Sequence, residues 1–356
     1  MCNVVNFLLS LAGRGPARRQ ARLDILDDMV ARGDCKRVRR TELALALAAV
    51  SFVWPMAAQV QKAAAAGHPD LDGIWNAATA TPLERPARLK DKAFFTPEEA
   101  AQWERQAAAR NQDPAQIRPG SFASYNNLFY EHGTKLPSSR RTSIITDPPD
   151  GRIPALTPTA AAEMRHHLEL LKNPRAATDL GLQDQCIVFS TAVPMLPYIY
   201  NSNYQIVQTG AEIMINVEMI HDTRVIRLDR QSHLPPSIQL WLGDSLGHWE
   251  GSTLVVDTTN FRDGSGYFGE AGGMYASDRN LHVIEHFSPL DANTILYRFE
   301  VEDPTVYTRP WKGELTLERS PGPMFEYACH EGNYALPALL QGAEPQKAAS
   351  SSANQR

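Results

Sequence analysis

Ten residues near the end of the chain are rich in side chains that can do chemistry. The segment Phe325–Tyr334 contains a thiol, an imidazole, two carboxylates, an amide and two phenols. An imidazole next to a carboxylate can exchange protons near neutral pH, so we expect His330 and Glu331 to be catalytic. An ordinary hydrogen-bonded histidine is the alternative for His330. Cys329, just before them, is expected to form a structural crosslink.

A carboxyl group inside a predicted strand is the next candidate. In a strand over residues 281–287, alternation places Glu285 on the same face as Val283 and Phe287. Burial among apolar neighbours raises the pKa of an unpaired carboxyl, and a raised pKa suits a general acid or base. Glu285 is therefore expected to be catalytic, with a structural carboxylate paired to an arginine as the alternative.

The segment 254–261 is a predicted strand with polar side chains on both faces. Asp257 shares one face with Val255, while Thr258 lies on the other. A purely structural barrel more often fills such positions with valine, isoleucine and leucine. The pattern predicts a partly polar, ligand-holding interior and makes Asp257 a further acid–base candidate. A polar network that only stabilises the barrel is the alternative.

Two candidate substrate-binding residues lie in a predicted hairpin. Arg224 can hold a carboxylate with two parallel hydrogen bonds, and His221 lies close before it in the chain. Asp222 is expected in the turn itself, where aspartate is common. A plain solvated turn is the alternative for the whole group.

A loop bounded by prolines, from Asp303 to Trp311, supplies three more candidates. Aromatic and arginine side chains at a barrel mouth suit recognition of a ring and of a carboxylate. We expect Tyr307 and Trp311 to stack on a ring. Arg309 and Arg224 would orient an anionic group. Simple packing of the loop is the alternative.

Three histidines define a metal alternative. His282 and His286 share a strand face but lie about 13 Å apart, which is too far for one metal ion. His330 could join one of them in space. No cofactor is otherwise expected, and a divalent transition metal remains the alternative to metal-free chemistry.

The export pattern near the N-terminus predicts where the protein works. Residues 36–58 combine a basic start, an apolar run and a small-residue end, as signal peptides do. The run stops short of the roughly 20 apolar residues that a membrane span needs. We expect cleavage near Ala58 and a periplasmic or secreted protein with no stable membrane span. A retained N-terminal anchor is the alternative.

The remaining limits of the folded domain follow from composition. Residues 1–35 are rich in arginine and patternless, and we expect them to be an untranslated or non-structural extension. Residues 59–67 are expected to be a linker, and the small polar residues 343–356 a disordered tail. The folded domain is then 68–342.

The charge of the exported part argues against nucleic acid as a partner. Residues 1–58 hold nine Lys or Arg and five Asp or Glu, so 26 basic and 35 acidic residues remain, a net charge of −9. Nucleic-acid binding needs clustered Lys and Arg. The expected partner is a small apolar or aromatic molecule, with or without a carboxylate group.

The exported part keeps two cysteines, Cys186 and Cys329. In an oxidising compartment we expect a disulfide between them, which would tie the middle of the domain to its end. Two buried free thiols or a thiol–metal site are the alternatives.

Two helices and a series of strands must position these residues. A capping box at Thr96–Glu99 predicts a helix to about Arg110, and Thr157–Pro158 opens a second one through about Lys172. Strands are predicted at 204–208, 212–219, 224–228, 238–242, 254–261, 281–287, 295–301, 313–317 and 325–329, with a turn at 247–251. This pattern predicts a mainly β fold, an antiparallel lipocalin-like barrel with two inserted helices in its N-terminal half.

Several motifs resemble those of a family of uncharacterised exported bacterial proteins. The motifs are Asp72–Trp75, Glu218–Arg224, His233–Pro236, Trp241–Asp244, Trp249–Phe261 and Tyr327–Tyr334. The resemblance spans about 70–342 and implies no catalytic residue. Gly73–Trp75 also resembles the opening strand of the lipocalin-like (calycin) barrels.

The sequence thus predicts a periplasmic enzyme that acts on a small molecule by acid–base chemistry, as a lyase, isomerase or hydrolase. A non-catalytic binding protein of the same fold is one alternative. A metal-dependent enzyme that uses His330 is the other.

Overall fold

The computed structural model describes residues 67–112, 132–189, 193–198, 200–263, 266–268, 275–334 and 336–341. The predicted extension, signal peptide and tail lie outside these ranges, as does the linker apart from Gly67. Within the described ranges no helix is both long enough and apolar enough to cross a membrane.

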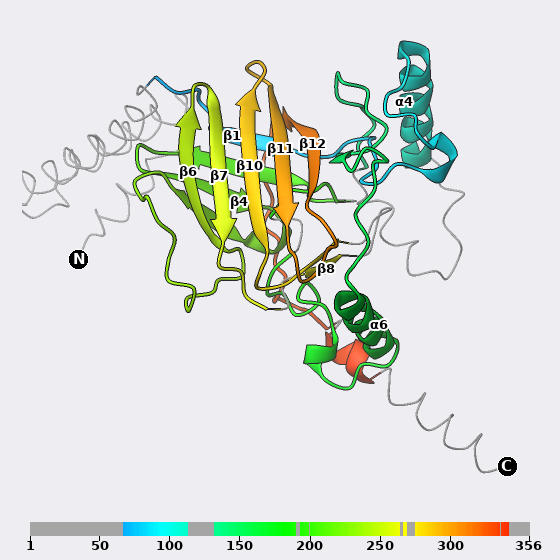
Figure 1. Cartoon of the computed structure of the whole chain (residues 1–356), viewed down its shortest axis with the longest axis vertical. Coiled ribbons are helices and arrows are strands. Elements are labelled where there is room, and N and C mark those ends of the chain that lie inside the picture. The colour runs from blue at the N-terminus through cyan, green and yellow to red at the C-terminus, as the bar shows by residue number, and fades with distance from the viewer. Residues whose placement is uncertain are drawn as a thin grey trace, which may run out of the picture. The chain divides into compact units, whose positions relative to one another are not determined.

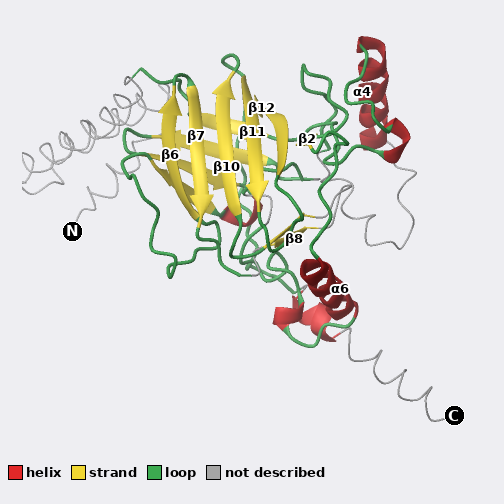
Figure 2. Ribbon diagram, viewed as in Figure 1, coloured by secondary structure: helices red, strands yellow, loops and turns green. Residues whose placement is uncertain are grey.

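Nine strands close into a barrel (Figures 1 and 2), which confirms the predicted mainly β barrel. Their order around it is β1 (Gly73–Asn76), β3 (Asn203–Gln208), β4 (Glu212–Val217), β5 (Thr223–Arg227), β6 (Asp244–Glu250), β7 (Thr253–Thr259), β10 (His282–Pro289), β11 (Thr294–Glu302) and β12 (Trp311–Arg319). β1 pairs with β12 and completes the ring. β2 (Ile145–Asp147) adds to β12, and β8 (Gly266–Phe268) pairs with β9 (Tyr275–Ser277) in a separate hairpin.

One pair of strands departs from the predicted antiparallel arrangement. β5 and β6 run parallel, with Ile226 opposite Ser245. The long connection 228–243 returns the chain to the end of the barrel where β5 began, as a parallel pair requires. A lipocalin barrel is an up-and-down barrel of eight strands, so this mixed barrel of nine does not establish the lipocalin-like type.

Three local predictions are wrong. Residues 238–242 and 325–329 are irregular rather than strands, and the predicted turn at 247–251 mostly belongs to β6. Gly247 explains the third error, because a Cβ there would lie 2.6 Å from the Cγ2 of Ile226 on the neighbouring strand. The glycine therefore allows close packing between β5 and β6 and does not mark a turn.

Both predicted helices are confirmed. α4 (Pro97–Gln112) begins with the predicted capping box, since the backbone N–H of Thr96 donates to Glu99 at 2.8 Å. α6 (Pro158–Lys172) is capped by Thr157, whose hydroxyl accepts from the N–H of Ala160 at 3.2 Å. Both helices lie outside the barrel wall (Figure 2).

The barrel interior is a packed core. Alternate residues are buried along β3, β4, β5, β10 and β11. The largest fully buried side chains include Trp75, Trp311, Tyr204, Tyr297, Tyr307, Phe261, Phe287 and Phe299. On β10 the buried face carries Val283, Glu285 and Phe287, as alternation predicts. The interior thus encloses a carboxylate within an apolar and aromatic lining.

Candidate functional site

The predicted catalytic residue Glu285 and the predicted substrate-binding residue Arg224 bind each other inside the barrel. Arg224 donates from Nη1 and Nη2 to the two carboxylate oxygens of Glu285, at 2.7 and 3.1 Å. The hydroxyl of Tyr297 donates to the same carboxylate at 2.7 Å and accepts from the N–H of Met195. The side chains of Arg224 and Glu285 are 2% and 0% exposed.

This interior pair leaves little capacity for acid–base work. Both oxygens of Glu285 already accept hydrogen bonds, and a substrate cannot reach a fully enclosed carboxylate without displacing its partners. Burial raises the pKa of Tyr297 well above its usual value, with a further contribution from Glu285, so the phenol keeps its proton. The arrangement is that of a structural tie between β5, β10 and β11. Within the part of the chain that the structure describes, the buried Nε of Arg224 has no hydrogen-bond partner.

The loop 303–311 does not gather its three candidate residues at one face. Tyr307 and Trp311 are buried, and their rings meet edge to face with centroids 5.9 Å apart. Arg309 lies on the outside, where it pairs with Asp147 at 2.8 Å. The two aromatic rings pack against each other, and this contact is the simple packing that was the alternative to ring recognition. The ligand-binding roles of the three residues stay predictions.

A second polar cluster, the Asp257 cluster, lies on the outer face of the barrel wall and consists of Asp257, His282 and His233. Asp257 Oδ1 lies 3.0 Å from the Nε2 of His282 and 3.2 Å from the Nε2 of His233. Asp257 is paired with Ile284 across the β7–β10 ladder, whereas Glu285 is paired with the buried Val256. Asp257 and Glu285 therefore belong to opposite faces and cannot form one site.

The Asp257 cluster is anchored by a buried carboxylate. Asp244 accepts from the Nδ1 side of the His233 ring at 3.1 Å, from the N–H of Leu234 at 2.9 Å and from Arg227 at 2.6 Å. This anchor fixes the ring of His233, whose Nε2 lies beside the carboxylate of Asp257. Sequence reasoning gave neither His233 nor Asp244 a role, because their pairing joins a loop to two strands and has no local signal.

Asparagine 260 shapes the loop that brings His233 to the wall. Its side-chain amide donates to three carbonyl oxygens, those of Leu234, Pro235 and Ile238, at 3.0 to 3.1 Å. Asn260 itself adopts a positive φ of 59°, which asparagine tolerates better than most residues. The loop is therefore held in a defined shape although it contains no strand.

The protonation of the Asp257 cluster suits proton transfer. The hydrogen bond from His282 lowers the pKa of Asp257, and the same bond raises the pKa of His282. His286, on the same face of β10, shows the contrast, since burial lowers its pKa. His282 is 33% exposed and Asp257 is 44% exposed, so solvent and small molecules can reach both.

The remaining predicted candidates lie apart from this cluster. His330 and Glu331 are exposed on the segment that follows β12, and His286 is on the barrel wall. Across the described ranges, no three His, Cys, Asp or Glu side chains are grouped as a metal ion would require.

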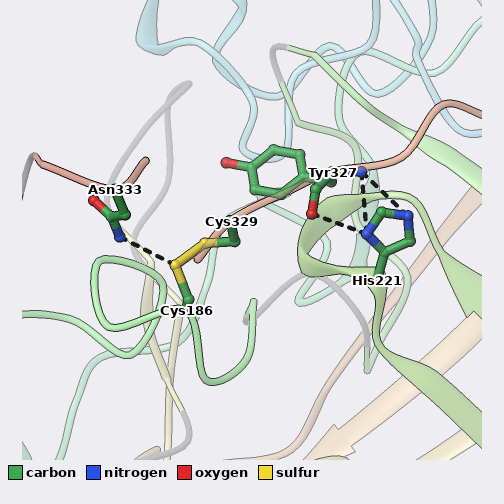
Figure 3. The surroundings of a disulfide bond; sticks show 5 residues. All are labelled: Cys186, His221, Tyr327, Cys329 and Asn333. Carbon is green, nitrogen blue, oxygen red and sulfur yellow. Dashed lines mark hydrogen bonds between the residues drawn. A yellow bond between two sulfur atoms is a disulfide. The ribbon is translucent and has the colours of Figure 1, made fainter. Parts of the chain in front are cut away.

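The segment 320–334 is fastened to one end of the barrel (Figure 3). A disulfide joins Cys329 to Cys186, as predicted, and Asn333 donates to the sulfur of Cys186 at 3.3 Å. The Nδ1 of His221 lies 2.9 Å from the carbonyl oxygen of Tyr327. His221 therefore has a structural contact with the segment 320–334, and its substrate-binding role stays a prediction.

Asp222 stands out at this end of the barrel. Burial raises the pKa of its carboxyl to about 6, and a hydrogen bond from the N–H of Phe189 opposes this rise. Its Oδ2 is buried and has no hydrogen-bond partner among the residues that the structure describes. The two preceding residues, Ile220 and His221, have positive φ angles of 61° and 59°. Sequence reasoning placed Asp222 in an ordinary turn and missed this environment.

The chain matches no protein-family model, and comparisons with curated proteins and with solved structures give no significant match. The resemblance to exported bacterial proteins and to calycin barrels therefore remains a hypothesis from sequence motifs.

Proposed function

We propose that this chain is an exported enzyme that acts on a small apolar or aromatic molecule by acid–base chemistry, with the Asp257–His282 pair transferring the proton. The observation that carries the proposal is the hydrogen bond of 3.0 Å between Asp257 and the Nε2 of a partly exposed histidine. A carboxylate that orients an imidazole is the usual arrangement of a general base.

Each group has a distinct role in this proposal. Asp257 holds the proton on Nε2 of His282, so the lone pair of the neutral ring lies on Nδ1. That nitrogen is 4.0 Å from Glu302, which is too long for a hydrogen bond and leaves Nδ1 able to take a proton from a substrate or a water. Asp257 then stabilises the imidazolium that forms.

The surroundings of His282 favour some reactions over others. Within the described ranges no hydroxyl or thiol group hydrogen-bonds to its ring. A covalent serine or cysteine mechanism needs such a contact. The proposal is therefore proton abstraction or activation of a water, as in a lyase, an isomerase or a hydrolase.

The loop that carries His233 supports an apolar substrate. Ile238 and Leu240 are 43% and 39% exposed on it, a few residues beyond His233. Trp241 lies under the guanidinium of Arg262, 4.7 Å from ring centroid to Cζ. Exposed apolar side chains beside a polar group are typical of small-molecule contact surfaces.

Export is part of the proposal. The disulfide between Cys186 and Cys329 supports it, because disulfides persist in oxidising compartments such as the periplasm. Mass spectrometry of the protein recovered from the periplasmic fraction, with its N-terminal sequence, tests cleavage near Ala58.

The test of the chemistry compares three variants with the wild type. The purified protein is screened against small aromatic esters, lactones and enones, and the best substrate is carried forward. Asp257→Asn and His282→Gln should each lower kcat by about 10²–10⁴-fold with little change in substrate affinity. His286→Gln is the matched control on the same strand face, and it should keep the wild-type rate.

Two results would refute the proposed acid–base mechanism. One is a wild-type rate in both Asp257→Asn and His282→Gln when a substrate has been found. The other is ligand binding without turnover under all conditions, which favours the non-catalytic binding protein. Loss of rate on chelation, with restoration by a divalent metal, would favour the metal-dependent alternative.

A further inference from the structure

The ring of His233 lies between two carboxylates. Its Nδ1 is 3.1 Å from Oδ2 of Asp244 on β6, and its Nε2 is 3.2 Å from Oδ1 of Asp257 on β7. Both distances are within hydrogen-bonding range. The side chain of His233 is 24% exposed, so most of its surface is enclosed between the loop 228–243 and the barrel wall.

Both carboxylates are ionised in this setting. Burial acts to raise the pKa of Asp244, but hydrogen bonds, led by that from the N–H of Leu234, outweigh burial and lower it. The hydrogen bond from His282 lowers the pKa of Asp257. An ionised carboxylate only accepts hydrogen bonds, so each of the two needs an N–H on the ring nitrogen that faces it.

A neutral imidazole cannot satisfy both carboxylates. It carries one N–H and one lone pair, so one of the two contacts would bring a lone pair against a carboxylate oxygen. The imidazolium carries an N–H on each nitrogen and can donate to both. Arg227 donates to the other oxygen of Asp244 at 2.6 Å, so it leaves Oδ2 to His233 and to the N–H of Leu234. The positions of the two carboxylates therefore favour the protonated form of His233.

The same oxygen of Asp257 also contacts the proposed base, His282. The Nε2 atoms of the two histidines are no further apart than the sum of the 3.0 and 3.2 Å contacts that they make with Oδ1. The hydrogen bond to Asp257 raises the pKa of His282, with smaller contributions in the same direction from Glu302 and Glu300. A positive charge on His233 at this separation opposes a second positive charge on His282 and limits that rise.

We propose that His233 is a positioning residue for the proposed reaction: as an imidazolium between Asp244 and Asp257, it holds the carboxylate that orients His282 and, through its charge, favours the neutral form of His282 that can accept a proton. This inference rests on the function proposed above, in which His282 is the base. His233 does not contact the substrate in this scheme, because both of its ring nitrogens face carboxylates.

The first test is NMR of the purified protein with isotope-labelled histidines, which reads the protonation of each ring nitrogen without a substrate. The signals of His233 are assigned by their loss in His233→Gln. We expect both ring nitrogens of His233 to carry a proton at pH 7, whereas a neutral ring has one protonated and one bare nitrogen. A neutral His233 ring at pH 7 would overturn the proposal and leave the mechanism of Asp257 and His282 standing.

The charge of His233 is tested through the titration of His282. His233→Gln can still donate to Asp257 but has no charge, so the NMR titration midpoint of His282 should rise by about 0.5–1 pH unit. His233→Lys keeps a positive charge, and its midpoint should return toward the wild-type value. His248→Gln is the matched control, because His248 pairs with Glu250 where both side chains are exposed, and it should leave the midpoint unchanged. The far-ultraviolet circular dichroism of all three variants should match that of the wild type.

The pH profile of turnover gives the readout for the reaction. With a substrate, the acidic limb of kcat/KM should move to higher pH by the same roughly 0.5–1 unit in His233→Gln and should stay in place in His248→Gln. The proposal is overturned if the His282 midpoint is unchanged in His233→Gln, or if it rises equally in His233→Gln and His233→Lys. The expected NMR results without turnover of any substrate would refute the acid–base function, and with it the role of His233 in a reaction, while the charged bridge between Asp244 and Asp257 would stand.

Discussion

The buried ion pair between Arg224 and Glu285 allows a specific prediction about the unfolding free energy. Glu285→Gln keeps the shape of the side chain and removes its charge. The glutamine can still accept from one nitrogen of Arg224, but its own N–H₂ group then faces donors, and the arginine charge stays buried with no counter-ion. Removing one member of a buried pair costs about 3–5 kcal/mol of unfolding free energy.

The assay is urea unfolding followed by tryptophan fluorescence and circular dichroism. For an m-value of about 3 kcal/mol per molar, a loss of 3–5 kcal/mol lowers the midpoint by roughly 1 to 1.7 M. Glu300→Gln is the matched control, because Glu300 pairs with Lys312 on the outer face of β11. An exposed pair of that kind contributes only about 0–1 kcal/mol, so its midpoint should barely move.

A double variant separates loss of the pair from loss of the charge. Arg224→Met with Glu285→Leu removes both ions and keeps apolar volume, so its stability should return to within about 1–2 kcal/mol of the wild type. Tyr297 then loses an acceptor but keeps the N–H of Met195 as a donor. A Glu285→Gln midpoint within about 0.3 M of the wild type, with an unchanged m-value, would refute the reasoning.

Two further predictions concern the covered end of the barrel. The pKa of Asp222 is about 6 in the folded protein and 3.8 as its ordinary value, so its contribution to stability is fully present below pH 3.8 and is lost as pH rises through 6. After allowance for solvent screening, the unfolding free energy of Asp222→Asn relative to that of the wild type should rise by about 1–2 kcal/mol between pH 4 and pH 7, as measured by urea unfolding at each pH. A difference between the two proteins that stays constant with pH would contradict this prediction. Replacing both Cys186 and Cys329 by alanine opens a loop with a sequence separation of 143 and should lower the unfolding free energy by about 2–5 kcal/mol. An unchanged midpoint would show that the covered end contributes nothing to global unfolding.

Local sequence signals predicted the helices and strands correctly where residues close together in the chain determine the structure. The two helices follow from their capping residues, Thr96 with Glu99 and Thr157, which act within one turn. The buried face of β10 follows from alternation, because successive side chains of a strand must point to opposite faces. The disulfide was predicted because a cleaved export signal, itself a prediction, would leave only two cysteines in the chain, and the structure joins these two.

Tertiary structure alone decided which partners these residues have. Alternation left open which face of β7 points inward, and pairing with β10 settles that Asp257 lies outside while Glu285 lies inside. No local pattern joins His233 to Asp257, or Arg224 to Glu285, since each bond connects segments that meet only when the barrel closes. The sequence by itself determined the barrel, its helices and its crosslink. Which carboxylate is accessible and able to exchange a proton depends on contacts between distant segments, because those contacts set its burial and hydrogen bonds and therefore its pKa.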